Sequence, residues 1–223
     1  DSGSKETAQM IRRLEYKWIV GIVFVFGLFM ELLDMTIVNV AIPTLAREFD
    51  ATTTQVQWVV TGYALTFASL MLVGGKVADA YGRRLIFVIG IVVFTLASLL
   101  CGIAGSSEML IGARVLQGAG AALMNPATLS IIAATFPPRE RGTAIGIWAG
   151  TSALALAIGP LVGGLITEHL EWSWIFFVNI PVGVLAIVAS YLFIDESRDE
   201  THASLDLPGL ATSAIGLFAL TYG

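Results

Sequence analysis

Two carboxylates inside one long apolar run constrain this chain more than any other feature. The run extends from Trp18 to Ile42, and it contains Glu31 and Asp34. At about 1.5 Å per helical residue, such a run is long enough to cross a bilayer. A carboxylate in a spanning helix is costly, so both acids should face a bundle interior or a wet cavity and mark an ion or proton path. They are three residues apart and share one helical face. The alternative is that either acid pairs with a neighbouring helix only for packing.

The composition assigns the chain to the integral membrane proteins. The sequence is 56% hydrophobic and 13% charged, with a mean hydropathy of +0.82, whereas soluble domains average about 25% charged residues. A single cysteine, Cys101, provides no disulfide framework. The two histidines, His169 and His202, fall in predicted loops. We therefore expect no enzymatic activity, no metal site and no nucleic-acid partner.

Apolar runs divide the chain into an all-α, multi-span arrangement. Six complete spans are predicted at 18–40, 57–75, 85–105, 109–132, 143–166 and 174–194. Residues 1–17 predict a short amphipathic helix lying at the membrane surface. A loop is expected at 195–206, and the start of a seventh span at 207–223. The first run is too long for the apolar part of a signal peptide, so it should be retained as a span.

The distribution of basic residues predicts the orientation. Ten of the twelve Lys and Arg residues fall in the N-terminal segment and in the stretches 76–84, 137–142 and 195–206. The stretches expected on the other side contain only Arg47. Because basic loops remain in the cytoplasm, the N-terminus should be cytoplasmic.

This orientation allows the depth of the buried charges to be compared. Asp34 lies about six residues below the outer end of the first span, and Arg114 about five residues below that of the fourth, so both lie roughly 8–9 Å under the outer surface. Opposite charges at one depth can pair, which lowers the cost of both. We expect Asp34 to bind and release the coupling proton, with Glu31 as a second acid and Arg114 tuning the proton affinity.

Two further segments carry candidate functional residues. The stretch 75–84, GKVADAYGRR, could form a conformational latch through Gly75, Asp79, Gly82, Arg83 and Arg84. The alternative is a solvated basic loop that only sets topology. The fifth span has small residues four apart, which predict a close-packing ridge with a proline kink. This ridge comprises Gly142, Gly146, Gly150, Ala155, Gly159 and Gly163, interleaved by Pro160 and Gly164. It could be a static seam or a bending element.

Several side chains within the spans are candidates for a substrate pocket. Polar, aromatic and methionine side chains within spans suit varied amphipathic or cationic compounds. The candidates, besides Asp34 and Glu31, are Asn39, Tyr63, Met124, Asn125 and Trp148. For Tyr63 and Trp148, anchoring at the membrane interface is an equal alternative.

Five stretches together resemble the major facilitator superfamily, and specifically its branch of drug:proton antiporters with 14 spans. They are LLDMTIVNVAIP at 32–43, GKVADAYGRR at 75–84, RVLQGAGAA at 114–122, AIGPLVGG at 157–164 and WSWIFFVNIPVG at 172–183. The resemblance implies proton coupling through Arg114 and an antiporter motif at Gly159, Pro160, Gly163 and Gly164. Ala155 and Ser173 depart from residues that are usual in the family, glycine and arginine respectively.

The resemblance implies a major facilitator fold of which this chain forms the N-terminal six-helix half. The expected function is export of amphipathic, often cationic drugs across the bacterial cytoplasmic membrane, with protons as the coupling ion and no cofactor. The missing C-terminal half and the lipid bilayer are the implied partners. Proton-coupled uptake on the same fold is the first alternative. A non-transporting membrane subunit is the second, and buried charges argue against it.

The orientation can be tested by labelling. We expect a single cysteine placed at Ser106, in a Cys101→Ser background, to react with a membrane-impermeant maleimide added outside intact cells, because 106–108 should be an outer loop. Reaction only after the cytoplasmic face is opened would contradict the predicted topology.

Overall fold

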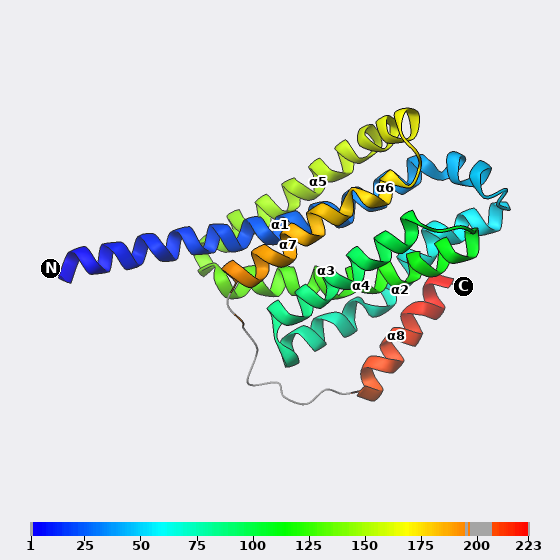
Figure 1. Ribbon diagram of the computed structural model, residues 1–223. Helices are drawn as coiled ribbons and strands as arrows, with labels where there is room; N and C mark the ends of the chain where they lie inside the picture. Colours follow the sequence, from blue (N-terminus) through cyan, green and yellow to red (C-terminus); the bar gives the residue numbers. More distant parts are fainter. Residues whose placement is uncertain (1, 195, 197–206, 223) are drawn as a thin grey trace.

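All secondary structure in the described part of the chain is helical (Figure 1). The computed structural model describes residues 2–194, 196 and 207–222. The helices are α1 (Ser2–Glu48), α2 (Thr53–Tyr81), α3 (Arg83–Gly102), α4 (Ser107–Thr135), α5 (Pro138–His169), α6 (Trp174–Phe177), α7 (Asn179–Phe193) and α8 (Leu207–Tyr222). Within the described residues, six helices are long and apolar enough to cross a membrane, with α6 and α7 together forming the sixth. The prediction of an all-α protein with six spans is confirmed.

The N-terminal segment is not the separate helix that the sequence predicted. α1 continues without a break from Ser2 to Glu48, so the backbone of residues 2–17 extends the first span (Figure 1). No proline or glycine lies between Ser4 and Val20. With no residue of low helix propensity in this stretch, the helix propagates through it.

The predicted loop at 76–84 is also largely helical. α2 continues to Tyr81 and α3 begins at Arg83, which leaves Gly82 alone between them. Gly82 has a φ of 121°, a conformation that costs glycine little because it lacks a Cβ. One glycine therefore makes the whole reversal between the second and third spans.

Polar residues at the other helix starts cap the spans. Thr52 and Gln55 form a reciprocal capping box at the start of α2, and the Ser106 hydroxyl accepts from the backbone N–H of Met109 at the start of α4. Pro138 is the first residue of α5, where its missing N–H costs nothing. These local signals determine where the spans begin.

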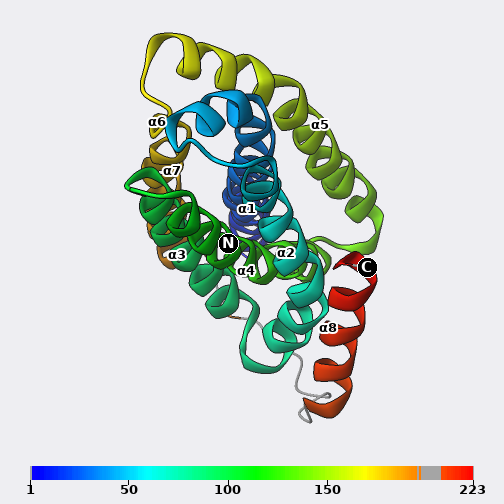
Figure 2. The same ribbon diagram turned by 90° about the vertical axis from the view of Figure 1, so that its right-hand side faces the viewer.

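The helices lie side by side in the bundle (Figures 1 and 2) and approach one another closely at glycines. α4 packs mainly against α2 and α3, while α1 packs mainly against α5 and α7. A Cβ on Gly118 of α4 would lie 2.5 Å from the Tyr63 carbonyl oxygen, and one on Gly163 of α5 would lie 3.2 Å from the Ile37 Cα. Membrane helices approach this closely only where side chains are small.

The predicted ridge of α5 packs over only part of its length. Ala155, Gly159 and Gly163 are buried, and a Cβ on Gly159 would collide with the Thr36 side chain of α1. A Cβ added to any of four other glycines of α5 would have no neighbouring atom within 4 Å in the described structure. These are Gly142, Gly146, Gly150 and Gly164. The expectation of one long packed ridge was wrong, because only Gly159 and Gly163 among the glycines of α5 approach α1 closely.

A helix begins at the position where the start of a seventh span was predicted. α8 starts at Leu207 and packs against α2. Of the loop predicted at 195–206, residue 195 and residues 197–206 lie outside the described residues.

Gly159→Leu should weaken the packing between α1 and α5. Leucine cannot fit against Thr36 without moving one helix, and overpacking of this kind costs about 1–3 kcal/mol. We expect a lower thermal unfolding midpoint in detergent. Gly164→Leu is the matched control, because that neighbouring glycine faces open space. Equal stability of the two variants would contradict the packing assignment.

Candidate functional site

The centre of the bundle contains an ion pair between α1 and α4. The Arg114 Nη1 atom lies 2.6 Å from the Asp34 Oδ2 atom, and the two side chains are 1% and 0% exposed. The predicted pairing of Asp34 with Arg114 is confirmed. An ion pair out of water requires good geometry and further hydrogen bonds to offset the loss of hydration.

The Asp34 carboxylate accepts hydrogen bonds on both oxygens. Its Oδ1 atom accepts from the Gln117 Nε2 atom at 3.0 Å and from the Asn179 Nδ2 atom at 2.8 Å. With Arg114 on Oδ2, three donors from α4 and α7 surround the charge. Hydrogen bonds to an ionised group are about twice as strong as neutral ones.

Arg114 has partners of its own besides Asp34. Its Nη1 atom donates to the Gln117 Oε1 atom at 2.6 Å, and its Nε atom donates to the Val59 carbonyl oxygen at 3.2 Å. The guanidinium carbon lies 4.3 Å from the centre of the Tyr63 ring, within the range of a cation–π interaction. Val59 and Tyr63, both on α2, therefore contact the Arg114 guanidinium in addition to its partners on α1 and α4.

A break in the sixth span places Asn179 beside Asp34. α6 ends at Phe177 and α7 begins at Asn179, and Pro181 has no N–H to donate to the Phe177 carbonyl. The Asn179 Nδ2 atom also donates to the Ser98 hydroxyl at 3.0 Å, and that hydroxyl donates to the Phe176 carbonyl at 2.9 Å. Ser98 of α3 thus forms hydrogen bonds to residues on both sides of the break between α6 and α7.

Glu31 lies one turn from Asp34 and is 4% exposed. Its Oε1 atom accepts from the Asn125 Nδ2 atom at 3.3 Å, whereas its Oε2 atom has no hydrogen-bond partner among the described residues. The two acids share one helical face, as predicted, but only Asp34 has a cationic partner within ion-pair distance in the described structure. Glu31 is thus a buried acid held by one neutral amide.

The predicted pocket residues lie in different surroundings within the described part of the chain. Tyr63 stacks under Arg114, Met124 is in the core, and Asn125 contacts Glu31. Asn39 is exposed and donates to the Met35 carbonyl of its own helix. Trp148 packs beside the buried cluster formed by Ile132, Phe136 and Ala144. The sequence could not separate these positions, because each depends on how a whole helix is rotated.

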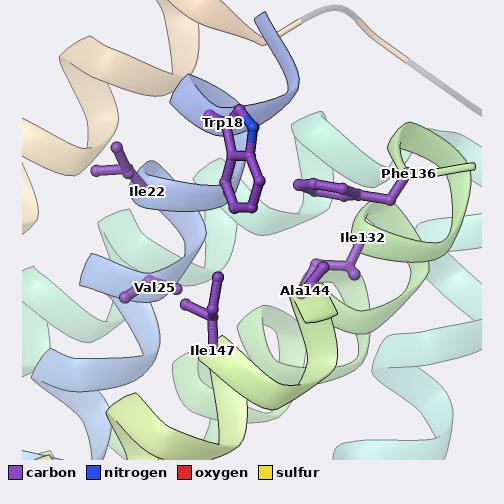
Figure 3. A pocket seen from close by; sticks show the side chains of 8 residues that line it. Trp18, Ile22, Val25, Ile132, Phe136, Ala144 and Ile147 are labelled. Carbon is purple, nitrogen blue, oxygen red and sulfur yellow. The ribbon is translucent and has the colours of Figure 1, made fainter. Parts of the chain in front are cut away.

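An apolar cleft that the sequence did not predict lies where α1, α4 and α5 meet (Figure 3). Its volume is about 200 Å³. Trp18 and Phe136 meet edge to face across it, with ring centres 5.6 Å apart. The lining residues are Trp18, Gly21, Ile22, Val25, Ile132, Phe136, Ala144 and Ile147. A cleft of this composition suits an apolar group.

The predicted latch residues make their contacts within this bundle. Asp79 and Arg83 pair with each other at 3.0 Å, while the Arg84 Nη1 atom donates to the Ile194 carbonyl at 2.6 Å, at the end of α7. Within the described bundle Arg84 thus contacts a helix end, and the predicted latch of Asp79 and Arg83 to the second half stays a prediction. Gly75 approaches α4, where its Cβ would lie 3.3 Å from the Pro126 Cβ.

Glu196 completes this junction, and the sequence analysis missed it. Its carboxylate accepts from the backbone N–H groups of Arg84 and Leu85, each at 3.1 Å. A carboxylate at the first turn of α3 satisfies free N–H groups and complements the helix dipole. A Cβ on Gly82 would lie 2.6 Å from the Glu196 Oε1 atom, so the glycine also makes room for this cap.

A six-span bundle with paired charges at its centre is the architecture of a secondary transporter. Residues 24–221 match the Major Facilitator Superfamily. The chain belongs to this superfamily.

Curated relatives support this assignment. The chain is 43% identical over 207 residues to the puromycin resistance protein pur8 of Streptomyces alboniger, covering 92% of this chain and 41% of that protein. It is 38% identical over 198 residues to the riboflavin transporter RibZ of Clostridioides difficile, covering 88% and 43%. It is 36% identical over 207 residues to the tetracenomycin C resistance and export protein of Streptomyces glaucescens, covering 92% and 38%. The chain thus spans about two fifths of the length of these relatives.

A solved structure confirms the fold. The crystal structure of a bacterial homologue of the human lysosomal transporter Spinster, inward-facing and unoccupied, superimposes with a TM-score of 0.66 and 21% identity. The match covers 80% of this chain and 42% of that one. The major facilitator fold predicted from the sequence is confirmed.

The ion pair should show strong coupling in a double-mutant cycle. Arg114→Met leaves a buried carboxylate without its cation, which should cost about 3–5 kcal/mol. Asp34→Leu combined with Arg114→Met should cost less than the sum of the single changes by at least about 1.5 kcal/mol. Unfolding free energies in detergent measure this difference. Additive losses would contradict a direct interaction in the folded protein.

Proposed function

We propose that this chain forms the proton-coupling half of an exporter of amphipathic, often cationic compounds. The buried pair of Asp34 and Arg114 is the observation that carries the proposal. Apolar residues of similar size usually serve stability as well as a buried ion pair does. A pair whose only role was packing would therefore bring no advantage, whereas a carboxylate that gains and loses a proton requires these surroundings.

The coupling follows from what protonation does to the pair. A charged Asp34 attracts Arg114 and two amide donors, Gln117 and Asn179, whereas a neutral Asp34 loses the Coulomb attraction. The two protonation states thus favour different helix arrangements, and a proton that binds one arrangement better shifts the equilibrium towards it. Arg114 tunes the proton affinity of Asp34 by approaching or retreating. Glu31, with one carboxylate oxygen unpartnered, is the second acid of the pathway.

The named activities of relatives support the substrate class. Two of the relatives are named for resistance to puromycin and to tetracenomycin C, the latter also for export. The apolar cleft of Figure 3 offers a surface for the apolar part of such compounds. A cationic substrate would compete with the proton for the acidic face of α1, so binding one would favour release of the other.

A second candidate is transport of a different organic compound on the same scaffold, by proton-coupled uptake. The similarity to a riboflavin transporter favours it. In both cases we place the chain in the bacterial cytoplasmic membrane with the N-terminus of α1 in the cytoplasm. A second half facing α2 and α5 would complete the substrate cavity between the halves. Asp79 and Arg83 would latch to a helix end of that second half in the outward-open state.

Asp34→Asn should abolish proton-coupled export, because the amide keeps the shape but cannot titrate. The measurement is ethidium transport together with proton flux in everted vesicles containing the full-length transporter. Glu31→Gln should reduce export less or change the range of substrates. Glu168→Gln, which removes an exposed carboxylate at the end of α5, is the control.

One result would show that Asp34 is not the residue that carries the proton. If Asp34→Asn still releases protons on drug binding and exports ethidium at the parent rate, Glu31 or the other half of the transporter becomes the candidate. Ethidium movement without any proton flux in the parent protein would contradict proton coupling altogether.

A further inference from the structure

The side-chain amide of Asn179 is buried with half of its hydrogen-bonding capacity unused. The residue is 1% exposed. Its Nδ2 atom donates to Asp34 and to Ser98, while its Oδ1 atom has no hydrogen-bond partner among the described residues. A buried acceptor without a partner costs free energy and calls for an explanation.

The observed network suits only a charged Asp34. Each of its three partners, the Arg114 Nη1, Gln117 Nε2 and Asn179 Nδ2 atoms, donates. A protonated carboxyl group must instead donate its own hydrogen to an acceptor. The Gln117 Oε1 atom already accepts from Arg114 at 2.6 Å. Among the groups that bond to Asp34, the one acceptor left free is the Asn179 Oδ1 atom.

We propose that Asn179 is the positioning residue that adapts the site to both protonation states of Asp34. The inference rests on the proposed function, in which Asp34 takes up and releases the coupling proton. When Asp34 is charged, the Asn179 amide donates to it, as observed. When Asp34 is protonated, a half turn of the amide brings its Oδ1 atom to face the carboxyl group and accept the hydrogen bond. The proton stays covalently bound to Asp34, and no bond to Asn179 forms or breaks.

The amide is poised between these orientations because each leaves one of its atoms unpaired. In the observed orientation the oxygen is unpaired, and after the half turn the nitrogen would be. An amide with partners on both sides would be locked, since turning it would lose every bond. In this proposal the protonation state of Asp34 decides the orientation.

Ser98 carries this change to the sixth span. Its hydroxyl accepts from the Asn179 Nδ2 atom and donates to the Phe176 carbonyl. Once the amide has turned, the hydroxyl faces an oxygen and can donate to it only by releasing Phe176. That carbonyl lies at the end of α6, beside the break before α7. Protonation of Asp34 thus weakens the bond that braces the interrupted helix.

The charged and titratable groups around Asp34 come from four helices. They are Glu31 of α1, Tyr63 of α2, Cys101 of α3 and Arg114 of α4. Asn179 carries no charge in either orientation. A change at Asn179 therefore alters hydrogen bonding to Asp34 and leaves the set of charges intact.

The test separates proton-driven export from downhill movement of the same compound. Asn179→Leu keeps the approximate size and removes both hydrogen-bonding atoms. We expect proton-driven ethidium export by the full-length transporter to fall at least about tenfold, since one bond to a charged group is lost, while downhill ethidium efflux from de-energised proteoliposomes stays within about twofold. The pH profile of export should shift. Threonine has a hydroxyl that can donate and accept, so Asn179→Thr should restore part of the proton-driven export and part of the parent pH profile.

Ser190→Ala is the matched control, because Ser190 is also buried on α7 and donates only to the Ala186 carbonyl of its own helix. It should change neither activity nor the pH profile. A parallel loss of both activities in Asn179→Leu, or an unshifted pH profile, would overturn the adaptive role. If that variant does not fold, Asn179→Ala removes the same amide without added bulk and is judged by the same criteria.

The Asp34→Asn variant distinguishes failure of the proposed function from failure of the inference about Asn179. In that case Asp34→Asn would retain proton release, and the inference about Asn179 would fall with it. If Asp34→Asn abolishes proton release while Asn179→Leu behaves like the parent, the proton carrier stands and only the role of Asn179 is overturned.

Discussion

The arrangement of the bundle depends on one carboxylate that is removed from both water and lipid. Asp34 of α1 receives Arg114 and Gln117 from α4 and Asn179 from α7. Arg114 reaches the Val59 carbonyl of α2, and Asn179 reaches Ser98 of α3. A buried charge requires donors at fixed positions, so five helices converge on this group. The polar centre constrains how far each helix can rotate.

Glycine makes this convergence possible. Gly118 approaches the backbone of α2, and Gly163 approaches that of α1. The helices pack in two groups with the same pattern. α1 packs on the fifth and sixth spans, and α4 packs on the second and third. This scheme is expected where two three-helix units repeat within one half of a transporter. The acid and the base thus lie on corresponding helices of the two units.

The third and sixth spans are joined at two levels. Deep in the bundle, Ser98 links α3 to the break between α6 and α7. At the other end of α7, Arg84 holds the Ile194 carbonyl and Glu196 caps α3. In the proposed mechanism, a protonation change at Asp34 acts on the deep link only. The other junction can then serve as a fixed point about which the sixth span responds.

The sequence by itself determined the spans, the fold and the central pair. Long apolar runs can only cross the membrane as helices, and two isolated opposite charges at one depth have few other ways to lower their cost. The tertiary structure decided which uncharged side chains reach Asp34 and which glycines contact a neighbouring helix, because the hydrophobic periodicity of the sequence does not encode these contacts. Asn179 falls within the stretch 172–183 that resembles the family, but neither it nor Ser98 carries a charge that would single it out, and only the packed helices bring both to Asp34. The same holds for the α5 ridge, since only the packed structure shows which of its glycines contact α1.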